Sequence, residues 1–164
     1  MIRRARIEDL PQMIDIYNYE ILHGVATFDE KEKTYEERKE WFEHFQGKYP
    51  LIVEEEDGRI KGYAGAYKLF QKPAYDISAE VTLYISQEYR GQGIGEKLLR
   101  ELVRVIEDEG QIEQLFSLIT STNLASKKLH EKVGFKFDGI FKKSGKKFGE
   151  RLSVDIYRYE TVKY

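Results

Sequence analysis

The chain has 164 residues, of which 41% are hydrophobic, and this is enough for one ordinary domain with its own core. Its 27 basic and 29 acidic side chains leave a net charge of −2, so the sequence offers no strongly positive surface for a nucleic-acid backbone. The absence of cysteine excludes disulfides, thiolate metal sites and a cysteine nucleophile, and it is typical of a reducing compartment. We therefore expect a cytoplasmic protein that does not bind nucleic acid.

The sequence predicts neither a membrane segment nor a metal site. No apolar run is long enough to cross a bilayer, and Glu8 and Asp9 interrupt the segment in which a signal peptide would have its apolar core. The three histidines are too scattered for the spacing of zinc ligands. We expect no membrane partner and no bound metal.

The first half of the chain predicts two helices and three strands. Apolar residues recur at helical spacing in residues 10–22, and Thr34-Tyr35-Glu36-Glu37 has the form of a capping box at the start of a second helix. Asp57-Gly58 is a strong signal for a hairpin turn. The predicted elements are a strand at 2–5, a helix at 10–22, a helix after residue 34 that runs through 41–45, and strands at 51–56 and 60–69.

Strands and helices alternate in the second half. The predicted elements are a strand at 79–86, a helix at 93–109, a strand at 115–120, a helix at 123–133 that Gly134 ends, and strands at 135–141 and 152–159. Hairpins that lead into a strand–helix–strand crossover require a mixed sheet with helices on its faces. We predict a single α/β (α+β) domain over 1–164, with a mostly antiparallel sheet of about six or seven strands and about four helices. The charge-rich segments 36–43 and 142–147 are predicted to be solvated surface, the second within a flexible polar stretch.

The segment Arg90-Gly91-Gln92-Gly93-Ile94-Gly95 joins a predicted strand directly to a predicted helix. Such a loop leaves backbone N–H groups at the helix N-terminus free to bind an anion, and the helix dipole favours phosphate there. It is not a Walker A loop, because Gly95 is followed by Glu96 and Lys97, and it lacks the third small residue of the dinucleotide fingerprint. The alternative is a simple connector, but three glycines are a costly way to build one.

The same loop carries a family resemblance. Arg90-x-x-Gly93-x-Gly95 matches the Gln/Arg-x-x-Gly-x-Gly/Ala signature of the GNAT superfamily of N-acetyltransferases, and the predicted element order is similar to that fold. Asn123-x-x-Ser126 resembles the second cofactor segment of the family, although helix capping is an alternative for Asn123. The resemblance implies that acetyl-coenzyme A is the co-substrate. The implied cofactor contacts are Leu83, Tyr84, Ile85, Arg90, Gly91, Gln92, Gly93, Ile94, Gly95, Asn123 and Ser126.

A narrower resemblance, to the phosphinothricin and methionine sulfoximine acetyltransferase group, rests on four short segments. These are Ile16-Tyr17-Asn18, Val25-Ala26-Thr27-Phe28, Lys72-Pro73-Ala74-Tyr75 and Ala79-Glu80-Val81. The group acetylates the α-amino group of small amino-acid analogues, and the resemblance implies a homodimer. Lys72 stands where the group usually has arginine, and a lysine offers a point charge rather than a fork to a substrate carboxylate. The candidate substrate-pocket residues are Phe28, Lys72, Tyr75 and Tyr84, with core packing as the alternative for the aromatic ones.

Glu80 and His130 are the candidate catalytic residues. Glu80 shares one face of its predicted strand with Thr82 and Tyr84, and a carboxylate on a central strand must face a cleft or have a partner. There it could take a proton from the acceptor amine, and the alternative is an ordinary ion pair. The resemblance places His130 where the family has its proton donor, as an acid or a second base, and a satisfied core histidine is the alternative.

These observations predict direct acetyl transfer from acetyl-coenzyme A to a small amine without a covalent enzyme intermediate, since no cysteine is present. The leading acceptor is a small amino acid or analogue with a free α-amino group. A protein N-terminus or a polyamine remains an alternative acceptor. A module that senses acetyl-coenzyme A without turnover is the alternative from another class, and a sensor would have no use for a base such as Glu80.

Overall fold

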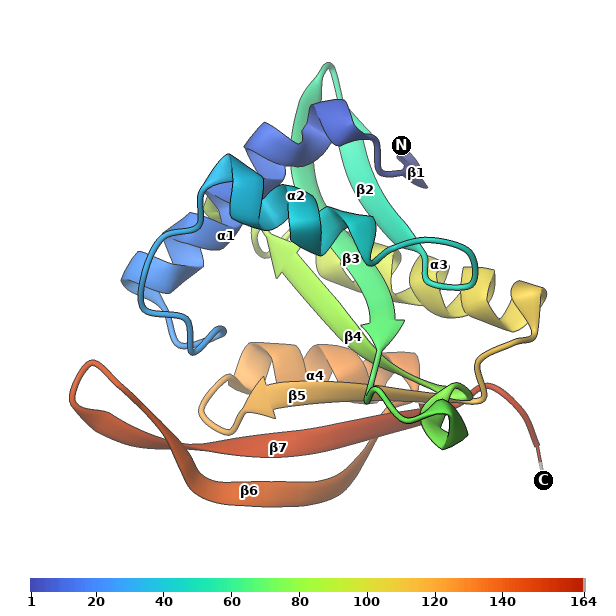
Figure 1. The fold of residues 1–164 in the computed structure, drawn as a ribbon. Coiled ribbons are helices and arrows are strands. Elements are labelled where there is room, and N and C mark those ends of the chain that lie inside the picture. Colours follow the sequence, from blue (N-terminus) through green and yellow to red (C-terminus); the bar gives the residue numbers. More distant parts are fainter. Residues whose placement is uncertain (164) are drawn as a thin grey trace.

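In the computed structural model, which describes residues 1–163, helices cover both faces of a seven-stranded mixed sheet (Figure 1). The strands are β1 (Ile2–Arg4), β2 (Leu51–Glu56), β3 (Arg59–Lys68), β4 (Ser78–Ile85), β5 (Gln114–Thr120), β6 (Lys136–Lys147) and β7 (Glu150–Glu160). The α helices are α1 (Leu10–His23), α2 (Tyr35–Glu43), α3 (Ile94–Glu109) and α4 (Leu124–Val133). The predicted fold class is confirmed, and each predicted element has a counterpart.

The sheet has the strand order β1-β2-β3-β4-β5-β7-β6, and every neighbouring pair is antiparallel except β4 with β5. The parallel pairing is short, because it joins only Ser78, Ala79 and Glu80 of β4 to residues 114–116 of β5. Beyond Glu80, β4 continues to pair with β3 while β5 continues to pair with β7. The two strands therefore part at the middle of the sheet (Figure 1). Residues of their C-terminal halves line a cavity between them.

Alternating side chains give the sheet an apolar layer on each face. Leu51 and Val53 of β2 pack with Met13 and Ile16 of α1, whereas Ile52 packs with the helices of the opposite face. That second face is covered by α3, whose apolar stripe of Leu98, Leu99, Leu102 and Ile106 is almost fully buried. Figure 1 shows α1 and α2 on one side of the sheet and α3 and α4 on the other.

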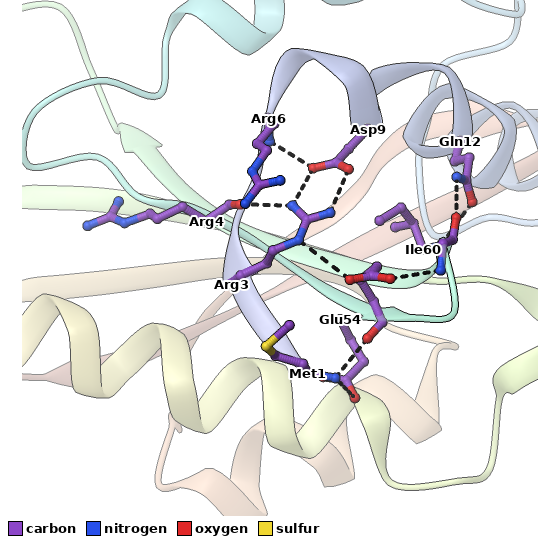
Figure 2. Close-up of polar contacts among 10 residues, drawn as sticks. Met1, Arg3, Arg4, Arg6, Asp9, Gln12, Glu54 and Ile60 are labelled. Atoms are coloured by element: carbon purple, nitrogen blue, oxygen red, sulfur yellow. Dashed lines mark hydrogen bonds and ion pairs between the residues drawn. The ribbon is translucent and has the colours of Figure 1, made fainter.

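An ionic and hydrogen-bonded network fixes the N-terminal edge of the sheet (Figure 2). Arg3 of β1 donates to both carboxylate oxygens of Asp9 at 2.8 and 2.9 Å, and the Arg6 amide donates to the same carboxylate at 2.7 Å. Burial alone would raise the pKa of Asp9, but these hydrogen bonds lower it overall. Gln12 of α1 bonds both Ile60 N–H and the carbonyl of residue 58, so α1 is anchored to the β2–β3 hairpin.

The two segments predicted to be solvated surface are mostly exposed, but each contains one buried cation, Arg38 in 36–43 and Lys147 in 142–147. The lysine-rich stretch is part of a longer hairpin, in which β6 runs to Lys147 and the turn lies at Phe148 and Gly149, with φ of 52° and 77°. Lys147 is only 1% exposed, because its Nζ donates to the Thr27 carbonyl at 2.8 Å and so replaces its contact with water. Arg38, inside the charged α2, is only 6% exposed because two aromatic rings cover its guanidinium.

Candidate functional site

One cavity, which we call the main cleft, has a volume of about 690 Å³. It is bounded by the C-terminal half of β4, by the glycine loop and by the first turns of α3 and α4. Ten of the eleven predicted cofactor residues line it, namely Leu83, Tyr84, Ile85, Arg90, Gly91, Gly93, Ile94, Gly95, Asn123 and Ser126. Gln92 is exposed and does not line the cleft, and its side-chain amide points back to the Glu88 carbonyl at 3.5 Å.

The three glycines of the loop serve two physical purposes. Gly91 and Gly93 have φ of 73° and 79°, in the left-handed region, where a side chain would strain the backbone. A Cβ at either position would enter open space, so both keep the loop accessible from the cleft. Gly95 instead allows α3 to approach α4, because a Cβ there would lie 3.1 Å from the Leu129 side chain.

The start of α3 has the properties of an anion site. Gly93 is the N-cap residue and has no side chain to accept a hydrogen bond, so the first N–H groups of α3 have no side-chain cap. These donors face the main cleft, since Gly93, Ile94, Gly95 and Glu96 all line it. The positive end of the helix dipole lies at the same place.

Arg90, at the beginning of the loop, forms an ion pair with Glu20 of α1. Glu20 is only 7% exposed and also lines the main cleft. Its carboxylate fits beside Gly24, where a Cβ would lie 2.2 Å from the nearer carboxylate oxygen. The main cleft therefore contains a buried negative charge whose partner is the arginine of the predicted phosphate loop.

Glu80 lies in a second, smaller cavity of about 100 Å³, the inner cavity, at the point where β4 and β5 part. The inner cavity shares Leu83, Tyr84, Asn123 and Ser126 with the main cleft, so the two adjoin. The Tyr67 hydroxyl of β3 donates to the Glu80 carboxylate at 2.8 Å. Burial raises the pKa of Glu80, and the hydrogen bond from Tyr67 lowers it by less, so the net pKa is raised.

His130 of α4 lines the same inner cavity and is 3% exposed. Its Nδ1 lies 2.7 Å from the Ser126 carbonyl, which can only accept, so Nδ1 carries the proton and Nε2 carries the lone pair. Nε2 is buried without a hydrogen-bond partner in the part of the chain that the structure describes. Burial lowers the pKa of His130 to about 4, despite the opposing effect of the Ser126 carbonyl, so the imidazole is neutral near pH 7.

A third cavity of about 320 Å³, the side pocket, lies between α1, α2 and the face of β3 and β4. It shares Tyr67, Thr82 and Tyr84 with the inner cavity. Arg38 projects from α2 into its wall, with its guanidinium 4.1 Å from the ring centre of Tyr17 and 3.6 Å from that of Trp41. The side pocket is thus a polar, aromatic extension of the cavity that contains Glu80.

The predicted substrate residues are not all brought together. Tyr84 borders all three cavities, with its ring 5.2 Å from that of Tyr17. Phe28 packs against Gly145 of the β6–β7 hairpin, where a Cβ would lie 2.2 Å from the ring. Lys72 is exposed, Tyr75 is 42% exposed, and neither lines any of these three cavities.

Sequence reasoning missed Glu20, Arg38 and Tyr67 as residues of the site. The sequence contains a weak signal for Tyr67, because Tyr67 and Tyr63 lie on the same face of a strand whose side chains alternate between the two faces of the sheet. Glu20 and Arg38 belong to helices whose charges are otherwise solvated, and nothing local distinguishes them from their neighbours. Asn123 was correctly given a capping alternative, since its side-chain oxygen accepts from Ser126 N–H at 3.2 Å.

Residues 1–163, the range that the structure describes, contain neither a metal-binding cluster nor a helix that could span a membrane. No three histidine, aspartate or glutamate side chains in this range lie together so as to hold a metal ion. No helix in it has the length and apolar character needed to span a membrane.

Comparison with known proteins agrees with the resemblance drawn from the glycine loop. The acetyltransferase (GNAT) domain family matches residues 2–153. The chain is 35% identical to phosphinothricin N-acetyltransferase of Streptomyces coelicolor, over 95% of this chain and 93% of that one. It is 32% identical to L-methionine sulfoximine/L-methionine sulfone acetyltransferase of Salmonella typhimurium, over 97% and 93% respectively. A phosphinothricin acetyltransferase from Sinorhizobium meliloti, solved in complex with acetyl-coenzyme A, superimposes with a TM-score of 0.92 at 33% identity, over 98% of this chain and 87% of that one.

Proposed function

The chain belongs to the GNAT family of acetyltransferases, and we propose that it transfers an acetyl group from acetyl-coenzyme A directly to the α-amino group of a small amino acid or amino-acid analogue. The observation that carries the proposal is the contiguity of two cavities. One has a glycine-rich helix N-terminus suited to a pyrophosphate, and the other has a carboxylate with a raised pKa.

The main cleft fits the co-substrate on chemical grounds. Acetyl-coenzyme A supplies an activated acetyl thioester and presents a pyrophosphate to its binding site. The free N–H groups at the start of α3 and the open backbone at Gly91 and Gly93 are donors for that pyrophosphate. Residues Leu83 to Ile85 lie along the cleft on the part of β4 that has no β5 partner, so their backbone groups can pair with an extended pantetheine arm.

Glu80 is the proposed general base. An ammonium group must lose a proton before its nitrogen can form the new C–N bond, and a carboxylate of raised pKa accepts that proton more readily. Tyr67 orients the carboxylate by its hydrogen bond of 2.8 Å. We propose that His130 acts with Glu80 as a neutral imidazole, whose Nε2 lone pair accepts a hydrogen bond from the amine or from a water in the inner cavity.

The test is release of coenzyme A thiol from acetyl-coenzyme A in the presence of single amines. We expect turnover with phosphinothricin, L-methionine sulfoximine or a related α-amino acid, and no turnover with the matching N-acetylated compound. Turnover with a polyamine or an N-terminal peptide alone would replace the proposed acceptor. Tight binding of acetyl-coenzyme A without turnover on any amine would favour the sensing module and refute the proposal.

A homodimer and a cytoplasmic location belong to the same proposal. Large apolar side chains on β5 and β6 support an interface between two copies, with Leu118 42%, Phe137 57% and Phe141 52% exposed. Sedimentation equilibrium of the purified protein would measure its mass directly. A chain without cysteine suits a reducing compartment, and cell fractionation would test the location.

A further inference from the structure

We propose that the side pocket determines which acceptor the enzyme uses, and that Arg38 binds an acid group on the side chain of the acceptor amino acid. The inference rests on the proposed function, because it takes the acceptor amine to lie beside Glu80. It assigns a role to a cavity and to a cation that the acetyl-transfer chemistry does not use.

Arg38 is a buried cation without a carboxylate partner. In the described part of the chain its one hydrogen-bond partner is the Tyr63 hydroxyl at 3.5 Å. Tyr17 and Trp41 cover its guanidinium at 4.1 and 3.6 Å and leave the in-plane N–H groups as the donors that remain. A charge removed from water in this way is costly unless an anion pairs with it, and an oxyanion matches the fork of a guanidinium.

The other charged groups of the side pocket already have partners. The Asp29 carboxylate accepts from the Tyr17 hydroxyl and lies 3.7 Å from Lys33 Nζ. The Glu37 carboxylate accepts from Thr34 N–H at 3.1 Å, as part of the cap of α2. The guanidinium is therefore the charge in the side pocket that can accept an anionic ligand without displacing an existing ion pair.

The separation of Glu80 and Arg38 indicates which acid group reaches Arg38. Glu80 pairs with Tyr67 and Tyr84 pairs with Tyr63, so the tyrosine that contacts Arg38 is four residues along β3 from the partner of Glu80. At about 3.3 Å per residue, the two tyrosines are about 13 Å apart along the strand. Arg38 lines the side pocket but not the inner cavity, and Glu80 lines the inner cavity but not the side pocket, so a molecule that contacts both must extend from one cavity into the other.

An α-carboxylate stays beside the amine in the inner cavity, because its oxygens lie within about 4 Å of the nitrogen on the same α-carbon. An acid group at the γ or δ position of the side chain can extend towards the side pocket. The acceptor class that fits is an α-amino acid with a side-chain carboxylate or phosphinate. Such a molecule would lie across Thr82, which borders both the inner cavity and the side pocket.

Two acceptors that differ in charge provide the test. Phosphinothricin and L-methionine sulfone have nearly the same shape, but the phosphinate is anionic and the sulfone is neutral. We expect the wild-type enzyme to prefer phosphinothricin in kcat/KM. Arg38→Met should lower kcat/KM by about 100-fold for phosphinothricin and by less than about tenfold for the sulfone, as expected when one partner of a buried charge pair is removed.

Two further substitutions locate the effect. Arg59→Met, at the exposed first residue of β3, makes the same chemical change away from all three cavities and should leave the preference unchanged. Lys72→Met tests the other cation assigned to the substrate. Loss of the acid preference in Lys72→Met but not in Arg38→Met would overturn the inference, and so would an equal loss on both acceptors in Arg38→Met.

The single tryptophan allows a binding test on the unaltered protein, which does not depend on how Arg38→Met folds. Trp41 stacks on Arg38, so an anion at the guanidinium should change its fluorescence. We expect a saturable change with phosphinothricin at concentrations where L-methionine sulfone has none. Identical titrations with both compounds would refute the role of Arg38.

The outcomes separate this inference from the proposed function. Acetylation of both acceptors without a charge preference would leave the function standing and refute the role of the side pocket. Saturable, charge-dependent binding at Trp41 without acetylation of any amino acid would support the anion site and refute the proposed function.

Discussion

The burial of His130 should appear as a pH dependence of stability. Histidine in an unfolded chain titrates near 6.5, whereas burial lowers the pKa of folded His130 to about 4. The unfolded state then binds the proton more tightly, so the free energy of unfolding falls as the pH falls from 6.5 towards 4. At about 1.4 kcal/mol per pKa unit, the full loss is about 3 kcal/mol, of which about 2 kcal/mol should be lost by pH 5.

His130→Asn provides the reference, because asparagine can still donate to the Ser126 carbonyl but does not titrate in this range. Urea unfolding of both proteins at pH 7 and pH 5 gives the free energies of unfolding. Other titrating groups contribute to both proteins and cancel in the difference. We expect the stability of the wild type relative to the variant to fall by about 2 kcal/mol between the two pH values.

A relative stability that is the same at pH 7 and pH 5 would refute the reasoning. It would mean that folded His130 titrates at its ordinary value and can be protonated at neutral pH. The imidazolium could then donate a proton to a leaving thiolate. The expected result instead keeps His130 neutral during turnover, with Nε2 as an acceptor.

Three other substitutions test the remaining parts of the site. Glu80→Gln should lower kcat by about 100-fold or more, with partial recovery at high pH, where free amine is plentiful. In the wild type, kcat/KM should rise as the pH passes the raised pKa of Glu80. A variant whose pH–rate profile matches that of the wild type would rule out Glu80 as the base. Gly93→Ala should weaken acetyl-coenzyme A binding by about tenfold in calorimetry. The control, Gly58→Ala, introduces a Cβ at the same φ of 79° outside the main cleft and should lose only about 1–2 kcal/mol of stability. If both variants bind acetyl-coenzyme A with equal affinity, Gly93 is not part of the binding site. Glu20→Gln should strengthen acetyl-coenzyme A binding by up to about fivefold at low salt, because it frees Arg90 from its ion pair. Weaker binding would instead show that Glu20 positions Arg90 for the co-substrate.

Features that depend on neighbouring residues were predictable from the sequence. The capping box at Thr34 forms in both directions with Glu37. Asp57 and Gly58 turn the β2–β3 hairpin with φ of 51° and 79°. The glycine loop precedes α3 as its spacing indicated. Each pattern acts over about six residues or fewer, so the local sequence alone contains its physical cause.

The boundaries of the C-terminal hairpin were less predictable. Residues 142–147 have the composition of a solvated loop, yet β6 continues through them, because after an irregularity between Phe141 and Gly145 the pairing with β7 resumes at residues 145–147. The pairing strand, not the local composition, supplies the hydrogen bonds that make this segment a strand. The same tertiary contacts bury Lys147 under the carbonyls of residues 20 and 27.

The sequence by itself determined the fold class, the position of the glycine loop and the face of β4 on which Glu80 lies. Only the tertiary structure decided that β4 and β5 part after Glu80, that Tyr67 lies opposite it, and that Arg38 enters a cavity beside it. The physical reason is the separation of the contacting residues along the chain, because strand register and helix docking depend on residues tens of positions apart. The connection between β3 and β4 has no short turn to set the pairing of Tyr67 with Glu80, so the packing of the whole sheet sets it.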